Sequence, residues 1–254
     1  MHHKIALITG ASSGMGRECV LQIAAKYPEL EELWVIARRA DRLEALEEMV
    51  GNMVVRALPL DLTQKKDLQK LEKQLAEEQP DVCIAVIAAG RGNYGNFADL
   101  DFEDIRTMVR LNDESYALTT HLVLPYLSQG SQLILFASSA AFLPQPGFGV
   151  YAASKSFALS LARTLHYELR CQGIHVTAVC PGPVRTEFFD IACEGMERPA
   201  YKDRFMVEAR DVVALALKDA ARNKQLSIYS AAMKGLYFAS KVIPHRWILS
   251  FMCR

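Results

Sequence analysis

The sequence predicts an α/β fold in which one parallel sheet of about seven strands carries helices on both faces. Short apolar runs alternate along the chain with longer segments of helical periodicity, as in units where a helix connects two parallel strands. Runs such as residues 82–90 are apolar without alternation, which is typical of strands buried on both faces. The chain has 254 residues, of which 51% are hydrophobic, so it can bury one large core. No linker or repeat divides residues 1–254, and a single domain is expected.

The expected elements follow one another in a regular order. The strands are the apolar runs at residues 4–10, 33–38, 54–61, 82–90, 132–139, 175–182 and 226–230. The helical patterns lie at about 14–26, 40–49, 64–79, 101–127, 150–171 and 209–222. In the third helix Leu68, Leu71 and Leu75 recur at helical spacing within a charged segment, which predicts an amphipathic surface helix. The stretch at about 187–209 is irregular, and about 231–254 form a C-terminal tail.

Composition excludes several classes of function. The 29 basic residues balance 29 acidic ones, so global charge gives no reason to expect nucleic-acid binding. The six cysteines form no C-x-x-C pair and the six histidines have no metal-ligand spacing, so we expect reduced thiols and no metal site. Residues 4–9 run directly into a glycine-rich turn without a signal peptide, and no apolar run is long enough to span a bilayer. A cytoplasmic protein is therefore expected.

The glycine-rich turn after the first strand is the first candidate binding site. It reads Thr9-Gly10-Ala11-Ser12-Ser13-Gly14-Met15-Gly16. Glycines at such a turn let the backbone approach a pyrophosphate, which then lies at the positive N-terminus of the following helix. Because the turn ends the first strand and opens the first helix, it predicts a dinucleotide site. The alternative is a turn that only packs the helix on the strand.

A second candidate motif occurs twice. Tyr151 and Lys155, and again Tyr237 and Lys241, stand four residues apart, which places both side chains of each pair on one face of a helix. A nearby ammonium favours the phenolate, so such a lysine can make tyrosine a usable proton donor or acceptor. Tyr151 opens a helix directly after the fifth strand, at the sheet edge where ligands bind in this architecture. Tyr237 lies beyond the last expected strand.

The turn T-G-x-x-x-G-x-G and the pair Y-x-x-x-K together resemble the short-chain dehydrogenase/reductase family, over nearly the whole chain. The resemblance implies a Rossmann-type doubly wound sheet and hydride transfer between a nicotinamide cofactor and a carbonyl or alcohol. It implies cofactor contacts in the first turn from Thr9, Gly10, Ser12, Ser13, Gly14, Met15 and Gly16. Further contacts are implied after later strands, from Asp61, Leu62, Ala89, Gly90, Tyr151, Lys155, Pro181, Gly182, Val184 and Thr186. Ala88 replaces the family's asparagine in N-A-G, which puts one structural hydrogen bond in doubt.

The resemblance also assigns the catalytic roles. Family members carry a serine about thirteen residues before the tyrosine, which selects Ser138, with Ser139 as the alternative; the same count from Tyr237 meets Lys224. Tyr151 is then the proton donor, and Ser138 donates a hydrogen bond to the same substrate oxygen. Lys155 binds the nicotinamide ribose and lowers the Tyr151 pKa, and Asn112 supports a water-mediated proton relay to that lysine. Tyr237 and Lys241 are interpreted as a coincidence of packing.

The end of the second strand indicates which cofactor is used. An acidic residue there would accept hydrogen bonds from the ribose hydroxyls of NAD(H), but the sequence has Ala37-Arg38-Arg39. An arginine can bind a 2′-phosphate through paired, charge-assisted hydrogen bonds. NADP(H) is therefore favoured over NAD(H). The alternative is that Arg38 and Arg39 only begin a solvated, charged helix.

The substrate and partners are less defined. The irregular stretch at about 187–209 could line a lipophilic pocket or pack only on itself, through Phe188, Phe189, Ile191, Met196 and Phe205. Gly92, Asn93, Tyr94 and Phe97, which follow the fourth strand, are also expected to border the site. The resemblance implies a homodimer or homotetramer packed through 101–127 and 150–171. Two further classes stay open as alternatives: a non-catalytic dinucleotide-binding regulator on the same fold and a sugar-nucleotide epimerase.

The C-terminal tail carries its own pattern. After Asp219 there is no acidic residue. The basic residues are Arg222, Lys224, Lys234, Lys241, Arg246 and Arg254, and apolar positions recur at Leu236, Ala239, Ile243, Trp247 and Phe251. A tail that packs over the substrate pocket or a neighbouring subunit is favoured over one that lies on an anionic membrane surface.

Overall fold

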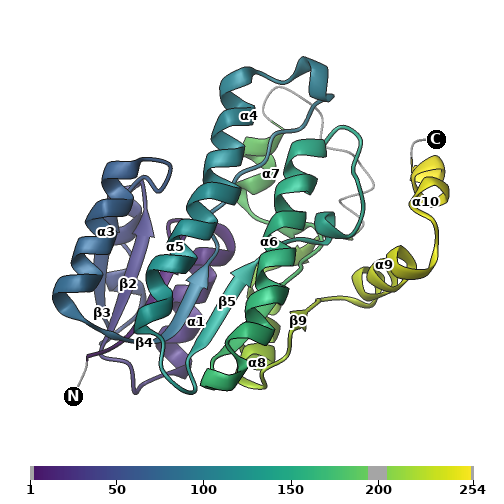
Figure 1. Ribbon diagram of the computed structural model, residues 1–254. Helices are drawn as coiled ribbons and strands as arrows, with labels where there is room; N and C mark the ends of the chain where they lie inside the picture. Colours follow the sequence, from purple (N-terminus) through teal and green to yellow (C-terminus); the bar gives the residue numbers. More distant parts are fainter. Residues whose placement is uncertain (1–2, 194–204, 253–254) are drawn as a thin grey trace.

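The computed structural model describes residues 3–193 and 205–252, and a seven-stranded sheet lies at its centre (Figure 1). The strands are β1 (Lys4–Thr9), β2 (Glu32–Ala37), β3 (Val54–Pro59), β4 (Asp81–Ile87), β5 (Gln132–Phe136), β6 (His175–Val179) and β9 (Leu226–Ser227). Their order is β3-β2-β1-β4-β5-β6-β9, and every neighbouring pair is parallel. The direction of winding reverses between β1 and β4, which opens a crevice at the carboxyl ends of these strands.

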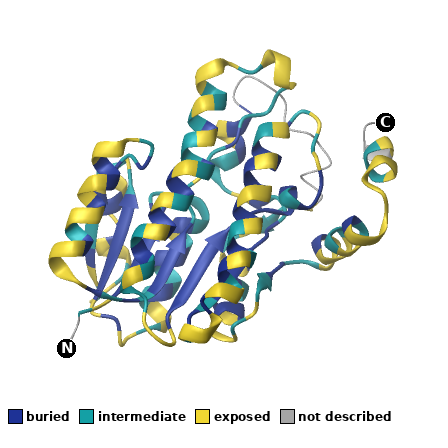
Figure 2. Ribbon diagram, viewed as in Figure 1, coloured by how far each residue is buried: buried dark blue, intermediate teal, exposed yellow. Residues whose placement is uncertain are grey.

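Helices cover both faces of the sheet, as the sequence predicts. On one face lie α3 (Lys65–Glu78), α5 (Ser115–Val123) and α6 (Gly149–Glu168), and on the other α1 (Gly14–Lys26), α2 (Ala40–Glu44) and α8 (Ala209–Ala221). The strands are buried between the two layers, while the outer faces of the helices are exposed (Figure 2). In α3 the buried positions include Leu68, Leu71 and Leu75, so the amphipathic pattern is confirmed.

The expected helix at 101–127 is interrupted. It consists of α4 (Phe102–Val109), a π-helical turn (Arg110–Glu114), α5 and a final 3₁₀ turn (Leu124–Tyr126). A π turn inserts an extra residue and so rotates the side chains that follow it. Here the turn carries Asn112, which is fully buried. The helix expected at 40–49 also divides, into α2 and a 3₁₀ turn (Glu47–Met49).

The irregular stretch after β6 begins and ends with short regular elements. A two-stranded parallel sheet joins β7 (Val184–Arg185) to β8 (Val207–Glu208), and α7 (Glu187–Ala192) follows β7. The two strands bring the start and the end of the stretch together. Met196, expected to line the pocket, lies outside the described residues.

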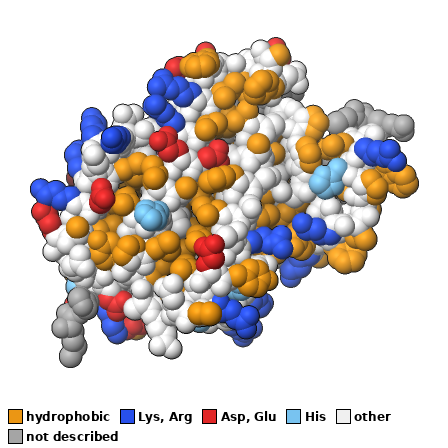
Figure 3. All heavy atoms as spheres, viewed as in Figure 1, with side chains coloured by type: hydrophobic (Ala, Val, Ile, Leu, Met, Phe, Trp, Pro, Cys, Tyr) orange, Lys and Arg blue, Asp and Glu red, His pale blue; other side chains and the backbone are white. Residues whose placement is uncertain are grey.

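The C-terminal tail forms α9 (Ala231–Val242) and α10 (His245–Met252), which lead away from the sheet (Figure 1). The last strand is shorter than expected because Ser230 has a φ of 73° and caps α9, its Oγ accepting from the Met233 amide. Met233 and Leu236 pack on the core from the inner side of α9. On its outer side Phe238 and Val242 are exposed, and Figure 3 shows hydrophobic and basic side chains over this segment.

None of the helices in the described part of the chain is long and apolar enough to cross a membrane.

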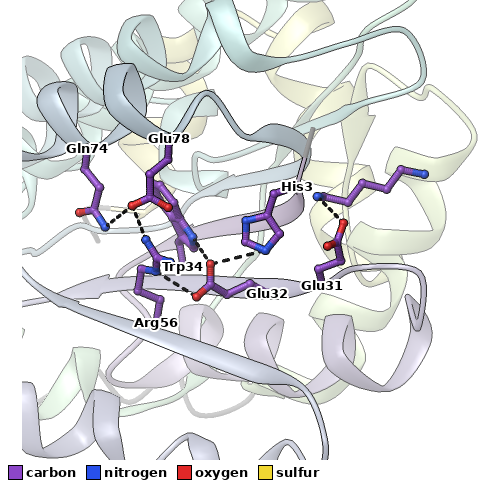
Figure 4. A network of polar contacts seen from close by, with 8 residues as sticks. His3, Glu31, Glu32, Trp34, Arg56, Gln74 and Glu78 are labelled. Atoms are coloured by element: carbon purple, nitrogen blue, oxygen red, sulfur yellow. Dashed lines mark hydrogen bonds and ion pairs between the residues drawn. The ribbon is translucent and has the colours of Figure 1, made fainter. Parts of the chain in front are cut away.

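The buried carboxylate of Glu32, at the start of β2, connects β2 to the neighbouring strand β3 (Figure 4). Glu32 accepts from Trp34 Nε1 at 2.7 Å and from Arg56 Nε at 2.9 Å, and Arg56 also pairs with Glu78 of α3. The Arg56 guanidinium lies 5.0 Å from the centre of the Trp34 ring. A buried charge with this many partners is satisfied. It lies at the amino ends of the strands, away from the crevice, so we assign it a structural role.

Candidate active site

The crevice at the carboxyl ends of the strands contains a cavity of about 1010 Å³. Every cofactor-binding residue that the sequence predicts borders it, apart from Thr9, and so do Ser138, Tyr151 and Lys155. The lining begins at the glycine-rich turn and Arg39, passes the ends of β4 and β5, and reaches α7 and α9. The structure therefore brings the predicted binding and catalytic residues to one site.

The glycine-rich turn presents bare backbone to the cavity. Gly10 and Gly14 have φ angles of 70° and 53°, which favour glycine. A Cβ on Gly16 would lie 2.2 Å from the Gly10 carbonyl oxygen, and one on Gly10 would lie 2.9 Å from the Ala89 nitrogen. The turn leads directly into α1, whose N-terminal amides can bind an anion. These features fit the pyrophosphate of a dinucleotide.

Thr9 acts behind the turn. Its Oγ1 accepts hydrogen bonds from the amides of Ala88 and Ala89, at 3.0 and 3.1 Å. These bonds hold the end of β4 against the end of β1. The loop after β4 is therefore fixed even though Ala88 offers no side-chain hydrogen bond.

Tyr151 and Lys155 lie on the first turns of α6, and both are buried. Burial raises the pKa of Tyr151 to about 12, although a hydrogen bond with the Ser138 side chain acts to lower it. This contact favours Ser138 over Ser139, whose amide bonds the Pro181 carbonyl. Burial also lowers the pKa of Lys155 to about 8, and Lys155 Nζ donates to the Phe136 carbonyl at 3.2 Å.

Lys155 was expected to lower the pKa of Tyr151, but in the structure the pKa of Tyr151 is raised. Lys155 Nζ lies 5.7 Å from the centre of the Tyr151 ring, and desolvation of the phenol outweighs the other influences on its pKa. Tyr151 is therefore protonated at neutral pH. A protonated phenol is the form that a general acid requires.

The second Y-x-x-x-K pair has nearly the same internal geometry but a different setting. Lys241 Nζ lies 5.5 Å from the centre of the Tyr237 ring, on α9. Lys241 is exposed, and the Tyr237 ring packs edge-on against Phe142 at 5.0 Å. Neither residue borders the cavity. Their surroundings favour the packing interpretation.

Asn112 fixes the loop that follows β4. Its Nδ2 donates to the Arg91 carbonyl at 2.8 Å and to Ser154 Oγ at 3.0 Å, and its Oδ1 accepts from the Arg91 amide at 2.9 Å. A Cβ on Gly90 would lie 3.2 Å from both Asn112 Oδ1 and Lys155 Nζ. Asn112 Oδ1 and Lys155 Nζ therefore both lie close to Gly90, and the water-mediated relay implied for Asn112 stays a prediction.

The sequence interpretation missed the neighbouring residue, Asp113. Its Oδ1 is buried and has no hydrogen-bond partner in the described structure. Burial raises the pKa of Asp113, and the Lys155 charge acts to lower it. The pKa of Lys155 is lowered chiefly by burial, and the Asp113 charge acts in the opposite direction, to raise it. Its position next to the predicted Asn112 was the one feature of the sequence that could have indicated Asp113 as a site residue.

At the end of the cavity nearest the carboxyl end of β2, the two predicted phosphate ligands Arg38 and Arg39 differ in exposure and in hydrogen bonding. Arg38 is exposed, whereas Arg39 NH2 donates to Ser12 Oγ at 3.0 Å. Arg39 and Arg42 both form ion pairs with Glu187, with shortest N–O distances of 3.1 and 2.6 Å. The sequence interpretation missed Arg42 and Glu187. Arg42 follows Arg39 by one helical turn and could have been included, but nothing in the sequence relates Glu187 to them.

The other end of the cavity is apolar. The Phe148 ring stacks on Tyr151 and Tyr94, with centroid distances of 4.3 and 4.1 Å, and Phe188 lies 5.3 Å from Tyr151. Of the residues proposed for a lipophilic pocket, Phe188, Phe189, Ile191 and Phe205 border the cavity, as does Gly92. Phe97 does not and is 70% exposed. The far wall is the inner side of α9, through Met233, Leu236 and Ala239.

Comparison with known proteins identifies the family to which the chain is similar. The family model for short chain dehydrogenases matches residues 4–195. The chain is 34% identical over 220 residues to sulfoacetaldehyde reductase 2 of Chromohalobacter salexigens, covering 83% of this chain and 86% of that protein.

Two solved structures also resemble the chain. A short-chain dehydrogenase from Sphingobium yanoikuyae in complex with NADPH has a TM-score of 0.80 at 29% identity, over 97% of this chain and 95% of that one. The bulky-bulky ketone specific alcohol dehydrogenase of Comamonas testosteroni has a TM-score of 0.76 at 26% identity, over 97% and 93%.

Proposed function

Because the chain belongs to the short-chain dehydrogenase family, we propose that it is an NADP(H)-dependent oxidoreductase that interconverts apolar carbonyl compounds and their secondary alcohols. The observation that carries the proposal is the position of Tyr151. Its side chain forms a hydrogen bond with the Ser138 side chain, and its ring contacts the rings of Phe148 and Phe188. A substrate carbonyl placed there would meet a proton donor, a second hydrogen-bond donor and an apolar surface.

The proposed chemistry follows from these side chains. A reduced nicotinamide, when bound, would supply a hydride to the carbonyl carbon, and negative charge would develop on the carbonyl oxygen. Tyr151 gives its phenolic proton to that oxygen, and Ser138 donates a hydrogen bond to it. Lys155 holds the cofactor ribose and keeps a positive charge beside the phenolate that forms. Asn112 keeps the loop after β4 in place through Arg91. In the reverse direction, Tyr151 accepts the proton of the alcohol.

The apolar end of the cavity supports the proposed substrate class. Aromatic and aliphatic side chains from α7 and α9 border it, and such a lining discriminates by size and shape more than by charge. The similarity to a bulky-bulky ketone specific alcohol dehydrogenase supports the same class. NADPH oxidation should therefore be faster with large aryl or alkyl ketones than with a short sulfonated aldehyde of equal concentration. A clear preference for the sulfonated aldehyde would contradict the proposed class.

The proposed cofactor preference can be tested at Arg39. Loss of a charge-assisted partner typically costs about 1.5–3 kcal/mol, so Arg39→Ala should weaken NADPH binding by roughly tenfold or more. NADH binding should be little changed, because NADH has no 2′-phosphate. Arg38→Ala tests the second candidate arginine, which also borders the cavity but is more exposed, and it should weaken NADPH binding less than Arg39→Ala. Ala37→Asp should weaken NADPH selectively. The preference would be refuted by a parent that uses both cofactors equally and variants that leave NADPH affinity unchanged.

The pH dependence of the reduction should depend on Asp113. The proposed mechanism needs a charged Lys155, whose pKa is about 8, so activity should fall as the pH rises through that value. Asp113 raises the pKa of Lys155, so Asp113→Asn should move this alkaline limb to lower pH. Cys180 and Tyr151, the other titratable groups beside Lys155, are unchanged in the variant.

The control for this variant is Glu114→Gln, which removes the adjacent but exposed carboxylate. It should leave the profile in place. Identical pH profiles for kcat in the parent and Asp113→Asn would exclude this role of Asp113.

A further inference from the structure

A carboxylate bridges the adenosine end of the cleft. Glu187, the first residue of α7, accepts hydrogen bonds from Arg42 of α2 at 2.6 and 2.9 Å and from Arg39 at 3.1 Å. Arg39 also donates to Ser12 Oγ of the glycine-rich turn. Ser12, Arg39 and Glu187 all border the cavity. The glycine-rich turn, α2 and α7 are therefore connected by the hydrogen bonds of Arg39 and Arg42 with the Glu187 carboxylate and Ser12.

This meeting point coincides with the place where a 2′-phosphate would bind. In this fold the residues after β2 contact the adenosine ribose, and Arg39 stands two residues after the end of β2 at Ala37. A guanidinium binds phosphate and carboxylate oxygens through the same paired geometry. We infer that Glu187 occupies the 2′-phosphate site in the cofactor-free protein, and that NADP(H) binds by displacing it. The inference rests on the proposed preference for NADP(H).

The charges favour displacement over shared binding. Two arginines and Glu187 leave one net positive charge at this point. A phosphate monoester carries a charge of about −1.5 to −2 near neutral pH, so it would repel Glu187 if both stayed on the same guanidinium groups. The ion pairs are easy to exchange, because the side chains of Arg39, Arg42 and Glu187 are 37%, 40% and 44% exposed. Pairs at that exposure are weak and are screened by salt.

The displacement would reach the substrate end through α7. The residue after Glu187 is Phe188, whose ring lies 5.3 Å from that of Tyr151 and 6.5 Å from that of Phe148. NAD(H) has no 2′-phosphate and would leave Glu187 on its arginines. Glu187 is therefore a specificity-determining residue, because it competes with one cofactor and not with the other.

The test compares dissociation constants for NADPH and NADH, measured by isothermal titration calorimetry on the parent, Glu187→Gln and Asp190→Asn. Asp190 is an exposed acid on the same helix, so its variant removes an equal charge without freeing the arginines. Glu187→Gln should bind NADPH about three- to tenfold more tightly than the parent, as expected for release of weak surface pairs. NADH affinity should stay within about twofold, and the gain for NADPH should shrink at high salt. Asp190→Asn should change neither constant.

Two results would overturn the inference. One is a Glu187→Gln variant that binds NADPH no more tightly than the parent. The other is an equal gain for both cofactors, which would indicate a general effect of charge. Failure of the cofactor proposal looks different: a parent without NADPH preference whose Glu187→Gln variant gains NADPH selectively would support the displacement and contradict the preference. A parent and a variant that both bind the two cofactors equally would contradict both.

Discussion

Replacing Tyr151 by Phe should lower kcat for carbonyl reduction by at least about a hundredfold, the lower range for losing a positioned general acid. The substitution removes one oxygen from a ring that packs against both Phe148 and Phe188, so the packing of the site should persist. NADPH should bind as tightly as in the parent, because Lys155 and the glycine-rich turn are unchanged. Steady-state kinetics and a direct binding titration measure the two quantities separately.

Tyr237→Phe is the matched control for this prediction. It makes the same change in the second Y-x-x-x-K pair, which has nearly the same lysine-to-ring distance but does not border the cavity. Turnover should stay within a few-fold of the parent. If Tyr237→Phe were inactive and Tyr151→Phe active, the proposed catalytic assignment would be wrong.

Gly16→Ala should abolish cofactor binding and destabilise the fold. The added methyl group would lie 2.2 Å from the Gly10 carbonyl oxygen and 2.6 Å from its carbon, and backbone atoms cannot move aside as a flexible side chain could. Overpacking of this kind typically costs about 1–3 kcal/mol. Relief of the clash would shift the turn that approaches the pyrophosphate. Urea unfolding and NADPH titration measure the two effects.

The same substitution at Gly149 provides the comparison. A Cβ there meets no atom within 4 Å, and Gly149 opens α6. Gly149→Ala should therefore leave stability unchanged or raise it by up to about 1 kcal/mol, because alanine restricts the unfolded chain. Equal stability and equal NADPH affinity in Gly16→Ala and the parent would show that the turn tolerates a side chain.

The sheet and its order of elements could be predicted because strands buried on both faces leave a strong pattern. Local departures from regular structure, such as the π turn and the short β9, could not be predicted in this way. Asn112, in the π turn, forms hydrogen bonds with the backbone of Arg91, a residue 21 positions away that the fold brings near. The early end of β9 depends on the cap that Ser230 provides for α9, and a single serine within an apolar run gives a weak signal.

The candidate site shows the same division. Residues in local motifs, such as the glycine-rich turn and Tyr151 with Lys155, could be placed from sequence spacing. Glu187 could not be related to Arg39, because 148 positions separate them and only the fold brings them together. The apolar spacing of the tail was compatible with packing over the pocket, on a neighbouring subunit or on a membrane surface. In the structure Leu236 and Ala239, two positions of that pattern, border the cavity together with Met233. The raised pKa of Tyr151 depends on burial, which the motif alone does not specify.

The most direct test of the proposed function follows the transferred hydrogen. Purified protein is incubated with NADPH deuterated in turn on each face of the nicotinamide C4, together with a panel of large apolar ketones and aldehydes, and the alcohols are analysed by mass spectrometry. The account predicts deuterium on the carbinol carbon from one of the two labelled cofactors, formed by the parent and Tyr237→Phe and at least about a hundredfold more slowly by Tyr151→Phe. Tight NADPH binding by the parent without deuterated alcohol from any carbonyl compound would contradict the account and favour a non-catalytic dinucleotide-binding protein.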